Sequence, residues 1–392
     1  MDGIRLSHLL WRSNIPMINN RIKLSDVLLA SGPWKTKMIK LCDHLLGTPI
    51  ALAVPPKTPK HNSLPPSSRI LIIRPGGMGD AIFLLPILKA LRQQDPKRII
   101  NVLCESRNAA IFLSQPHLVN HTYLYSSLTD LRTLIKNSYD IVVDTEQWHY
   151  FSSLAGYFIN SHQTVGFASR PLRKKLFHKA INYDPSAYEL ENFINLFKDI
   201  LGATTSTPSI DNSFSLSEDM QSWANNMIQG TSCAISLGTH IPERRLTPQQ
   251  VTALIGPLLT QHNHVLLLGG PDAMSLAKNI TQEIDDQRLL NFTGKTSLIQ
   301  TAALLQKSNL VIGSDSGILH LSCAVGTKTI ALFGPGNTQK WAPRGEKHIV
   351  LHLNLPCSPC TFFGYTVPVC HGSCACMRNI DTKEILGKIL PC

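Results

Sequence analysis

The stretch Arg69-Ile-Leu-Ile-Ile-Arg-Pro-Gly-Gly-Met-Gly-Asp80 decides the fold. Its apolar run predicts a short buried strand, the glycines predict a tight loop, and the residues up to about Gln94 predict a helix. Two further runs, Ile99 to Cys104 and Tyr139 to Asp144, predict strands separated by helical segments. Because short apolar strands that alternate with helices are typical of a parallel sheet, we expect a sheet covered by helices on both faces.

The same pattern returns after a break rich in Thr, Ser and Pro between residues 204 and 215. Four further strands are predicted here, at Cys233–Leu237, His264–Leu268, Leu310–Gly313 and Thr329–Phe333. The sequence therefore predicts an α/β protein with two Rossmann-like domains that face each other across a cleft. We expect a basic N-terminal helical extension and linker, a first domain, a second domain and a cysteine-rich tail, over residues 1–68, 69–215, 216–350 and 351–392.

Positive charge is concentrated in the extension. The chain has 392 residues and a formal net charge of +11, and residues 1–68 hold nine Lys or Arg against three Asp. We find no nucleic-acid-binding module, so an anionic lipid or phosphorylated saccharide is the expected partner, although a solvated basic face without any partner fits equally well. The longest uncharged apolar run, Leu45 to Pro56, is too short to span a bilayer. Since we also find no signal peptide, we expect a cytoplasmic protein on the inner face of the inner membrane.

The loop after the first predicted strand places a carboxylate at the edge of the sheet. Gly76, Gly77 and Gly79 allow close approach to a ligand, and Asp80 stands where the helix begins. One interpretation is that Asp80 only caps the helix, and spacing alone favours this interpretation. The functional interpretation is a general base that removes a proton from an acceptor hydroxyl.

A second strand-to-helix junction follows Leu310–Gly313. Asp315 is suited to accept hydrogen bonds from sugar hydroxyls, Ser316 and Gly317 to offer backbone N–H groups to a diphosphate, and His320 to face the same site. The alternative is an ordinary capped helix with a core histidine, and the residues alone do not decide between the two.

Polar residues also end the predicted strand Tyr139–Asp144. Glu146 and His149 are candidates for holding hydroxyls or phosphates of the acceptor. A basic stretch follows, which consists of Arg170, Arg173, Lys174 and Lys175. These residues could bind an anionic acceptor, but we favour the interpretation that they form a solvated loop.

Residues 69–92 and 311–335 resemble the two signature regions of the heptosyltransferases, glycosyltransferase family 9, and segments 266–273 and 292–305 match in the same order. The resemblance covers roughly residues 69–380. It implies a GT-B fold and the inverting transfer of L-glycero-D-manno-heptose from an ADP-sugar to the lipopolysaccharide core or a related lipid-linked saccharide, without cofactor or metal. It also implies Asp80 as catalytic base, the donor motif Asp315, Ser316, Gly317 and His320, and Asp272 as a contact to the nucleoside.

One departure concerns the donor phosphates. The family usually has a Lys-Arg-Trp-Pro-like stretch, whereas this chain has Pro242-Glu-Arg-Arg-Leu-Thr-Pro248, with Arg244 in place of the lysine and Leu246 in place of the tryptophan. Arginine keeps the charge and binds phosphate through two parallel hydrogen bonds. We therefore expect Arg244, with Thr239 nearby, to bind the phosphates, while the identity of the donor stays open.

Six of the ten cysteines lie in the last 36 residues. The spacing is compatible with tetrahedral zinc, but the second Cys-x-x-Cys of a strong zinc motif is absent. The family often carries a similar tail, matched here at Cys357, Cys360, Cys370 and Cys376. Reduced or paired structural cysteines are the favoured alternative to zinc.

Two other functions remain open at this point. Nucleotide-sugar epimerases also use twin Rossmann-like domains, but their glycine-rich motifs differ from those found here. A non-catalytic saccharide- or membrane-binding protein with the same fold is the second alternative. The presence of Asp80 and Asp315 argues against this alternative, while the change to Arg244 favours it weakly.

Overall fold

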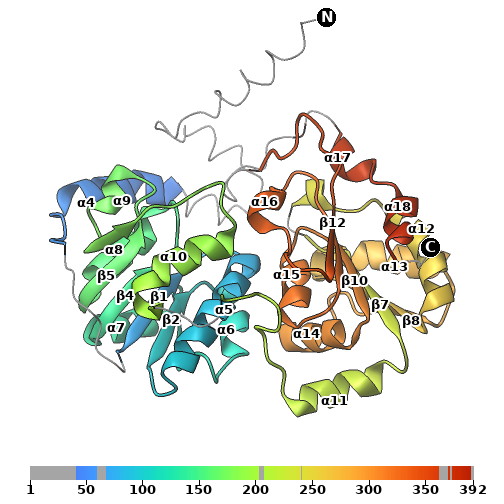
Figure 1. The fold of residues 1–392 in the computed structure, drawn as a ribbon, viewed down its shortest axis with the longest axis horizontal. Coiled ribbons are helices and arrows are strands. Elements are labelled where there is room, and N and C mark those ends of the chain that lie inside the picture. The colour runs from blue at the N-terminus through green and yellow to red at the C-terminus, as the bar shows by residue number, and fades with distance from the viewer. Residues whose placement is uncertain are drawn as a thin grey trace, which may run out of the picture.

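The chain forms two α/β domains, each built on a six-stranded sheet, that lie side by side (Figure 1). The computed structural model describes residues 41–59, 68–202, 207–239, 241–361, 370 and 373–389. The first sheet has the order β3-β2-β1-β4-β5-β6, and its strands are β1 Ile70–Arg74, β2 Ile100–Cys104, β3 His121–Leu124, β4 Tyr139–Asp144, β5 Ser161–Phe167 and β6 Lys179–Ile181. The second has the order β12-β11-β10-β7-β8-β9, with strands β7 Ser232–Ser236, β8 His264–Leu268, β9 Leu289–Asn291, β10 Leu310–Ser314, β11 Thr329–Leu332 and β12 His348–Leu351.

Every strand pair in both sheets is parallel. Counted from the first strand of each domain, both sheets follow the order 3-2-1-4-5-6, which is that of a Rossmann fold. The predicted α/β class with two Rossmann-like domains is confirmed, as are all seven predicted strands.

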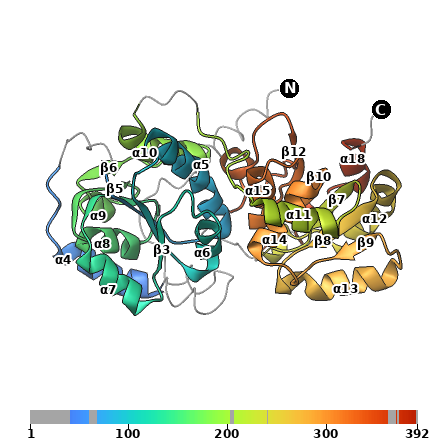
Figure 2. The ribbon, with the colours of Figure 1, turned by 90° about the horizontal axis from the view of Figure 1, so that it is seen from below.

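Helices cover both faces of each sheet (Figures 1 and 2). In the first domain, successive apolar side chains of β1 point to opposite faces of the sheet, so both faces need a covering layer. Ile70 and Ile72 belong to one apolar cluster, and Leu71 and Ile73 belong to another. The first cluster includes side chains from α5 Met78–Gln94, α6 Ser106–Leu113 and α10 Glu189–Leu201, and the second includes side chains from α7 Leu128–Lys136. The helix α8 Tyr150–Phe158 contacts β1, β4 and β5.

The second domain follows the same plan. One apolar cluster includes residues of α11 Glu218–Met227, α14 Leu298–Lys307 and α15 Gly317–Ala324, and another those of α12 Pro248–Gln261, α13 Met274–Glu283 and α18 Thr382–Gly387. Part of the cysteine-rich tail is held against this domain, because the Gln250 side chain donates hydrogen bonds to the carbonyls of Met377 and Ile380.

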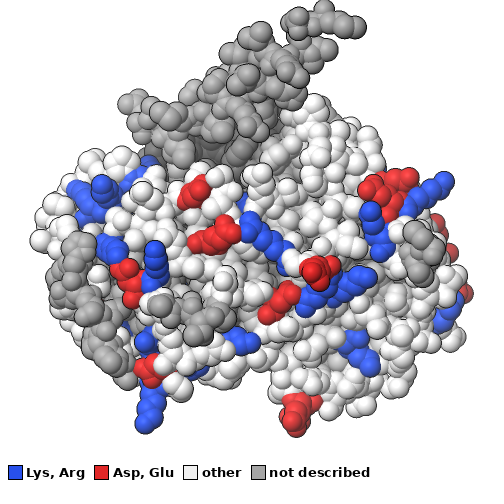
Figure 3. Space-filling view, viewed as in Figure 1, with Lys and Arg blue, Asp and Glu red and all other residues white. Residues whose placement is uncertain are grey.

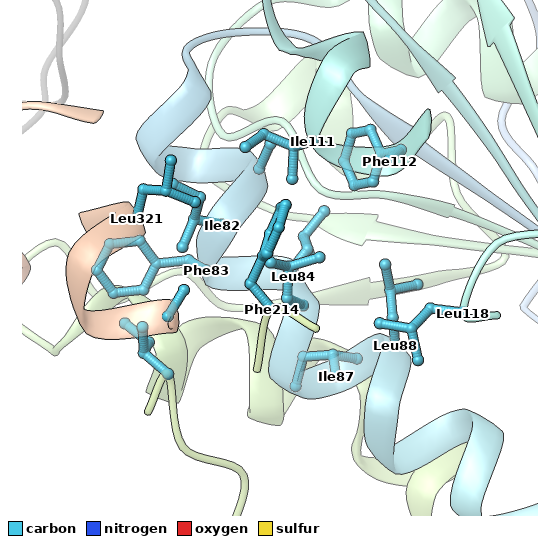
Figure 4. Packing of buried hydrophobic residues seen from close by; sticks show 14 of the residues in the cluster. Ile82, Phe83, Leu84, Ile87, Leu88, Ile111, Phe112, Leu118, Phe214 and Leu321 are labelled. Carbon is cyan, nitrogen blue, oxygen red and sulfur yellow. The ribbon is translucent and has the colours of Figure 1, made fainter. Parts of the chain in front are cut away.

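A continuous apolar cluster joins the two domains. It includes Phe83 of α5 and Leu321 of α15, and Figure 4 shows these two side chains beside Ile82. Phe214, from the segment that links the domains, belongs to the same cluster. The N-terminal turn of α5 is therefore held close to α15 of the other domain.

The described part of the extension packs on the first domain. The elements η1 Asp43–Gly47 and α4 Thr48–Ala53 lie against α8 and α9 Pro171–Lys174. The backbone N–H of Lys57 donates to the carbonyl of Lys175 at 2.8 Å, so this part of the predicted linker runs along the domain surface. The helices predicted before residue 41, and the linker residues 60–67, lie outside the described residues. Among the helices that the structure describes, none has the length and apolar character needed to cross a membrane.

Candidate functional site

The strand order places predicted site residues of both domains beyond the carboxyl ends of the central strands. In a Rossmann-type sheet, ligands bind beyond the carboxyl ends of the strands, where the strand order reverses. In the first domain this point lies between β1 and β4, which lead to Asp80 and Glu146; in the second it lies between β7 and β10, which lead to Thr239 and Asp315.

Asp80 lies in the first turn of α5 but does not cap it. The N-cap position is Gly77, and no side chain makes a cap hydrogen bond there. The capping interpretation of Asp80 is therefore wrong. The Asp80 side chain is one-third exposed, and its Oδ2 lies 3.2 Å from Nη2 of Arg74. This carboxylate is both accessible to a ligand and held in place by a buried cation.

Arg74, at the end of β1, was not predicted as a site residue. Its side chain is only 2% exposed, and its Nη1 donates to the carbonyl of Thr145 at 2.8 Å. Burial alone lowers the pKa of Arg74, but Asp80, Glu146 and Glu189 outweigh burial and raise it. A permanent positive charge therefore lies beneath the carboxylate of Asp80.

The loop between β1 and α5 requires glycine at one position. Gly76 has φ of +112°, and a Cβ there would lie 3.0 Å from Nη2 of Arg74 and 3.4 Å from Oδ2 of Asp80. The N–H of Gly76 donates to the Glu105 carboxylate at 3.1 Å. A side chain at Gly76 would strain the backbone and push against the Arg74–Asp80 pair.

The donor motif is built around a buried carboxylate. Asp315 follows β10, and its side chain lies 2.8 Å from Nη1 of Arg244 and 3.5 Å from Nε2 of His320. Burial raises the pKa of Asp315, but Arg244 and His320 outweigh burial and lower it. Ser316 is the N-cap of α15, and its hydroxyl accepts from the N–H of Leu319. Gly317 is the first residue of α15, so the predicted N–H groups belong to the helix N-terminus that follows Asp315 in the chain.

The two motifs meet across the domain boundary. A Cβ on Gly79 would lie 3.0 Å from Cδ2 of His320, and a Cβ on Gly317 would lie 2.7 Å from the side chain of Met78. The ring of His320 also lies edge-on to that of Phe83, with centroids 5.1 Å apart. The fold therefore brings the loop that carries Asp80 against the helix that follows Asp315.

Two further donor-side predictions lie near the same strand ends. The hydroxyl of Thr239 accepts from the N–H of Ile241 at 3.3 Å. Arg245, which was not predicted, donates to the Thr239 carbonyl at 2.8 Å and pairs with Asp272 at 2.8 Å. Thus Arg244 and Arg245 both pair with predicted donor-site carboxylates, whereas Leu246 is buried in the core.

The acceptor-side carboxylates are enclosed by cations. Asp144 pairs with Arg173 at 2.9 Å, and burial raises the pKa of Asp144 to about 6. Burial alone raises the pKa of Glu146, but His149, Arg74 and Arg173 outweigh burial and lower it. Nδ1 of His149 lies 3.2 Å from the carboxylate of Asp43 in the extension. Glu146 and His149 therefore both interact with charged side chains of the protein itself.

The expectation of a solvated basic loop after residue 169 is wrong for most of its members. Arg173 is fully buried, because its guanidinium fills the space between Asp144 and backbone carbonyls. Arg170 lies over the rings of Trp148 and Tyr150, and Lys175 donates to the carbonyls of Leu52 and Val54. Of the four basic residues, Lys174 has an exposed side chain.

A buried ion pair that the sequence analysis missed connects the two domains. Nζ of Lys340, in α16 Thr338–Trp341, lies 2.7 Å from the carboxylate of Glu189 at the start of α10. Glu189 also accepts a 2.8 Å hydrogen bond from the hydroxyl of Tyr183, whose pKa is raised by burial and by Glu189. Arg344 pairs with Glu191 of α10 and so adds a second ion pair between the domains. Figure 3 shows side chains of both charges near the middle of the molecule, where the two domains meet.

In the cysteine-rich tail, Cys376 is buried against the loop after β11, and a Cβ on Gly334 would lie 3.1 Å from its Sγ. Burial raises the pKa of the Cys360 thiol to about 11, with neighbouring cysteines adding to the effect. Among the described residues, no group of three or more His, Cys, Asp or Glu side chains is arranged to hold a metal ion.

Comparison with known proteins identifies the family of the chain. Residues 129–365, over half of the chain, match the model of glycosyltransferase family 9 (heptosyltransferase). The chain belongs to glycosyltransferase family 9. The lipopolysaccharide heptosyltransferase 3 of E. coli K12 is 25% identical over 69% of this chain and 84% of its own length. The Campylobacter jejuni lipooligosaccharide heptosyltransferase 2 is 29% identical over 32% of this chain, and the match spans only 40% of that relative.

A solved structure supports the family 9 fold. The E. coli ADP-heptose lps heptosyltransferase II aligns with a TM-score of 0.66 and 18% identity over 82% of this chain and 97% of that protein. The predicted resemblance to family 9, and with it the GT-B architecture, is confirmed.

Proposed function

We propose that the protein transfers a heptose from an ADP-heptose-like donor to the lipopolysaccharide core, or to a related lipid-linked saccharide, with inversion of the anomeric centre. The observation that carries this proposal is the meeting of two motifs at the domain boundary. The loop that carries the accessible carboxylate of Asp80 lies against the start of α15, which follows the Arg244–Asp315 pair, and we assign phosphate binding to these residues. The matched relatives are named for heptosyl transfer to lipopolysaccharide or lipooligosaccharide, and the aligned structure for ADP-heptose.

The first step belongs to the acceptor side. Asp80 accepts the proton of an acceptor hydroxyl while the oxygen of that hydroxyl bonds to the anomeric carbon. Arg74 holds the Asp80 carboxylate in place, because its buried guanidinium lies 3.2 Å from Oδ2 of Asp80. We assign Glu146 and His149, with the backbone at Gly76, Gly77 and Gly79, to the binding of the acceptor.

The second part of the reaction belongs to the donor side. As the bond from the anomeric carbon to the diphosphate breaks, negative charge develops on the leaving nucleoside diphosphate. Arg244 and the N–H groups at Ser316 and Gly317 stabilise this charge, and Asp315 accepts from sugar hydroxyls. His320 packs beneath the sugar, with Thr239 and Asp272 beside the phosphates and the nucleoside. The reaction takes its protons and electrons from the substrates alone, so the proposal includes neither metal nor cofactor.

The acceptor also sets the proposed location. A lipid-linked saccharide made in the cytoplasm lies at the inner face of the inner membrane, so we place the protein there as a peripheral protein. The basic extension and the anionic lipid surface are the corresponding partners.

The test is transfer itself. The purified protein is incubated with ADP-heptose, other nucleotide sugars and a truncated lipopolysaccharide acceptor, and both nucleotide release and acceptor mass are measured. We expect the acceptor to gain one heptose from ADP-heptose, with a product anomer opposite to that of the donor by NMR. Tight binding of a nucleotide without transfer from any donor would instead favour the non-catalytic alternative.

A further inference from the structure

The uncharged run that begins at Leu45 has its apolar side chains on the surface. Leu45 and Leu46 are each 56% exposed, Ile50 is 41% exposed and Leu52 is 61% exposed. All four lie on the consecutive elements η1 and α4, and we call this exposed apolar surface the α4 face. A continuous exposed apolar face of this kind marks an interaction site more often than scattered single side chains do.

The first domain fixes the orientation of the α4 face. Ala51 is fully buried and packs with Tyr150 and Leu154, while Gly47 lies so close to α8 that a Cβ there would be 2.9 Å from Cβ of Tyr150. Asp43 is buried, accepts a 2.7 Å hydrogen bond from the N–H of Phe151 and pairs with His149. The small residues therefore face the domain, and the large apolar ones face outward.

The surroundings of the α4 face carry positive charge. Lys175 donates to carbonyls at the C-terminal end of α4, and Lys174 is exposed beside it. Residues 147–183, which supply α8 and α9, contain no Asp or Glu. Figure 3 shows Lys and Arg side chains on the end of the first domain that carries α4 and α9 in Figure 1.

These observations define the chemistry of the partner. We propose that the α4 face docks on an anionic lipid bilayer, with its Leu and Ile side chains among the acyl-chain ends and Lys174 and Lys175 among the phosphate headgroups. An apolar face with Lys side chains beside it is the arrangement found in helices that lie in the plane of the membrane interface.

The docking explains how the acceptor reaches the site, and this part rests on the proposed function. The Asp43–His149 contact ties the docked segment to the loop after β4, next to Glu146. A lipid-linked saccharide in the same bilayer therefore meets the acceptor side of the site without leaving the membrane.

Vesicle binding tests the proposal with the full-length chain. Cosedimentation is measured with phosphatidylcholine vesicles that contain no phosphatidylglycerol or about one-third of it, at about 0.1 M and about 1 M salt. The variant Leu45→Asp/Leu52→Asp is compared with Leu128→Asp/Ile135→Asp, a matched control because Leu128 and Ile135 are 71% and 64% exposed on α7.

We expect the wild type and the α7 variant to bind the anionic vesicles equally and to retain part of their binding at high salt. The α4-face variant should bind at least about tenfold more weakly, because each inserted Leu contributes about one order of magnitude in partitioning. Equal binding by the two variants would overturn the proposal.

A fluorescent reporter excludes other occupants of the face. Leu46→Trp should show a blue shift on anionic vesicles, and Leu128→Trp should show none. An unchanged spectrum of Leu46→Trp, or a dimer without vesicles that Leu45→Asp/Leu52→Asp abolishes, would contradict lipid docking and favour residues 1–40 or a second copy as the occupant.

Activity on a deacylated acceptor in solution separates this proposal from the proposed function. The α4-face variant should transfer heptose to that acceptor at the wild-type rate and lose activity only on vesicle-bound acceptor. If the wild type binds vesicles through this face but transfers nothing, the proposed function fails and the docking stands. If the variant transfers to vesicle-bound acceptor as fast as the wild type, the docking fails and the proposed function stands.

Discussion

Replacing Lys340 by Met removes one member of the buried ion pair that connects the domains. The side chains of Lys340 and Glu189 are 3% and 1% exposed, and the two charged groups lie 2.7 Å apart. In the variant the Glu189 carboxylate stays buried, with the hydroxyl of Tyr183 and the side chain of Gln147 as its remaining direct donors. Loss of one partner from such a buried pair costs about 3–5 kcal/mol in the free energy of unfolding.

A double-mutant cycle measures how much the Lys340–Glu189 pair, whose two members belong to different domains, contributes to the free energy of unfolding. Lys340→Met, Glu189→Gln and the double variant form a cycle, with Lys328→Met at an exposed position as the control. We expect the control to change the free energy of unfolding by less than about 0.5 kcal/mol. The double variant should cost clearly less than the sum of the single ones, since Glu189→Gln removes the unpaired charge.

Domain separation gives a second readout for the same variants. Lys340→Met should increase protease cleavage in the connecting residues 202–217 and reduce kcat/KM, since Lys340 and Glu189 help to hold the two motifs together. Two results together would refute this reasoning: a loss of less than about 1 kcal/mol in the free energy of unfolding of Lys340→Met, and residues 202–217 that resist protease as well as in the wild type. The buried pair would then not hold the domains together.

Three further predictions concern single positions. Arg244→Ala should raise the KM for the donor about 10- to 100-fold and Arg244→Lys much less, because phosphate binding needs the charge; equal losses in steady-state assays would contradict this role. Because burial raises the pKa of Asp144 from 3.8 to about 6, its folded form binds the proton more tightly. The free energy of unfolding should thus fall by up to about 3 kcal/mol as the pH rises from 3.8 to about 6. Urea titrations of Asp144→Asn should lack this part of the pH dependence. Gly76→Ala should destabilise by at least about 1 kcal/mol, because of its φ of +112° and the nearby Arg74. Gly256→Ala, in a helix with open space, should be neutral or stabilising in thermal unfolding, and equal effects at the two glycines would refute the strain argument.

The fold could be predicted where strands are buried on both faces. Strands such as β1 and β4 read as continuous apolar runs, because helices cover both sides of the sheet. The strands β3 and β6 escaped prediction because they are short, polar and partly exposed near the edge of the sheet. β12 begins with the buried His348, whose ring pairs with Asp211, a contact that no local pattern reveals.

The candidate site divides in the same way. Asp80 and Asp315 were singled out because each stands at a strand-to-helix junction, which is a local signal, but their roles were inferred from the resemblance to family 9. Arg74, Arg173 and Lys340 were missed or misread, because a basic residue looks solvated in sequence until its distant carboxylate is known. Such buried charges depend on contacts between separate segments, which the residue pattern along the chain does not encode.

The most direct test of the account is the transfer rate of Asp80→Asn with ADP-heptose and a truncated lipopolysaccharide acceptor, measured beside the affinity of the variant for ADP. We expect kcat to fall by about 10²–10⁴ while the affinity for ADP stays at the wild-type value, because Asp80 takes the proton of the acceptor and belongs to the opposite domain from the nucleotide. Transfer by Asp80→Asn at a rate near that of the wild type would contradict the central claim that this carboxylate is the base.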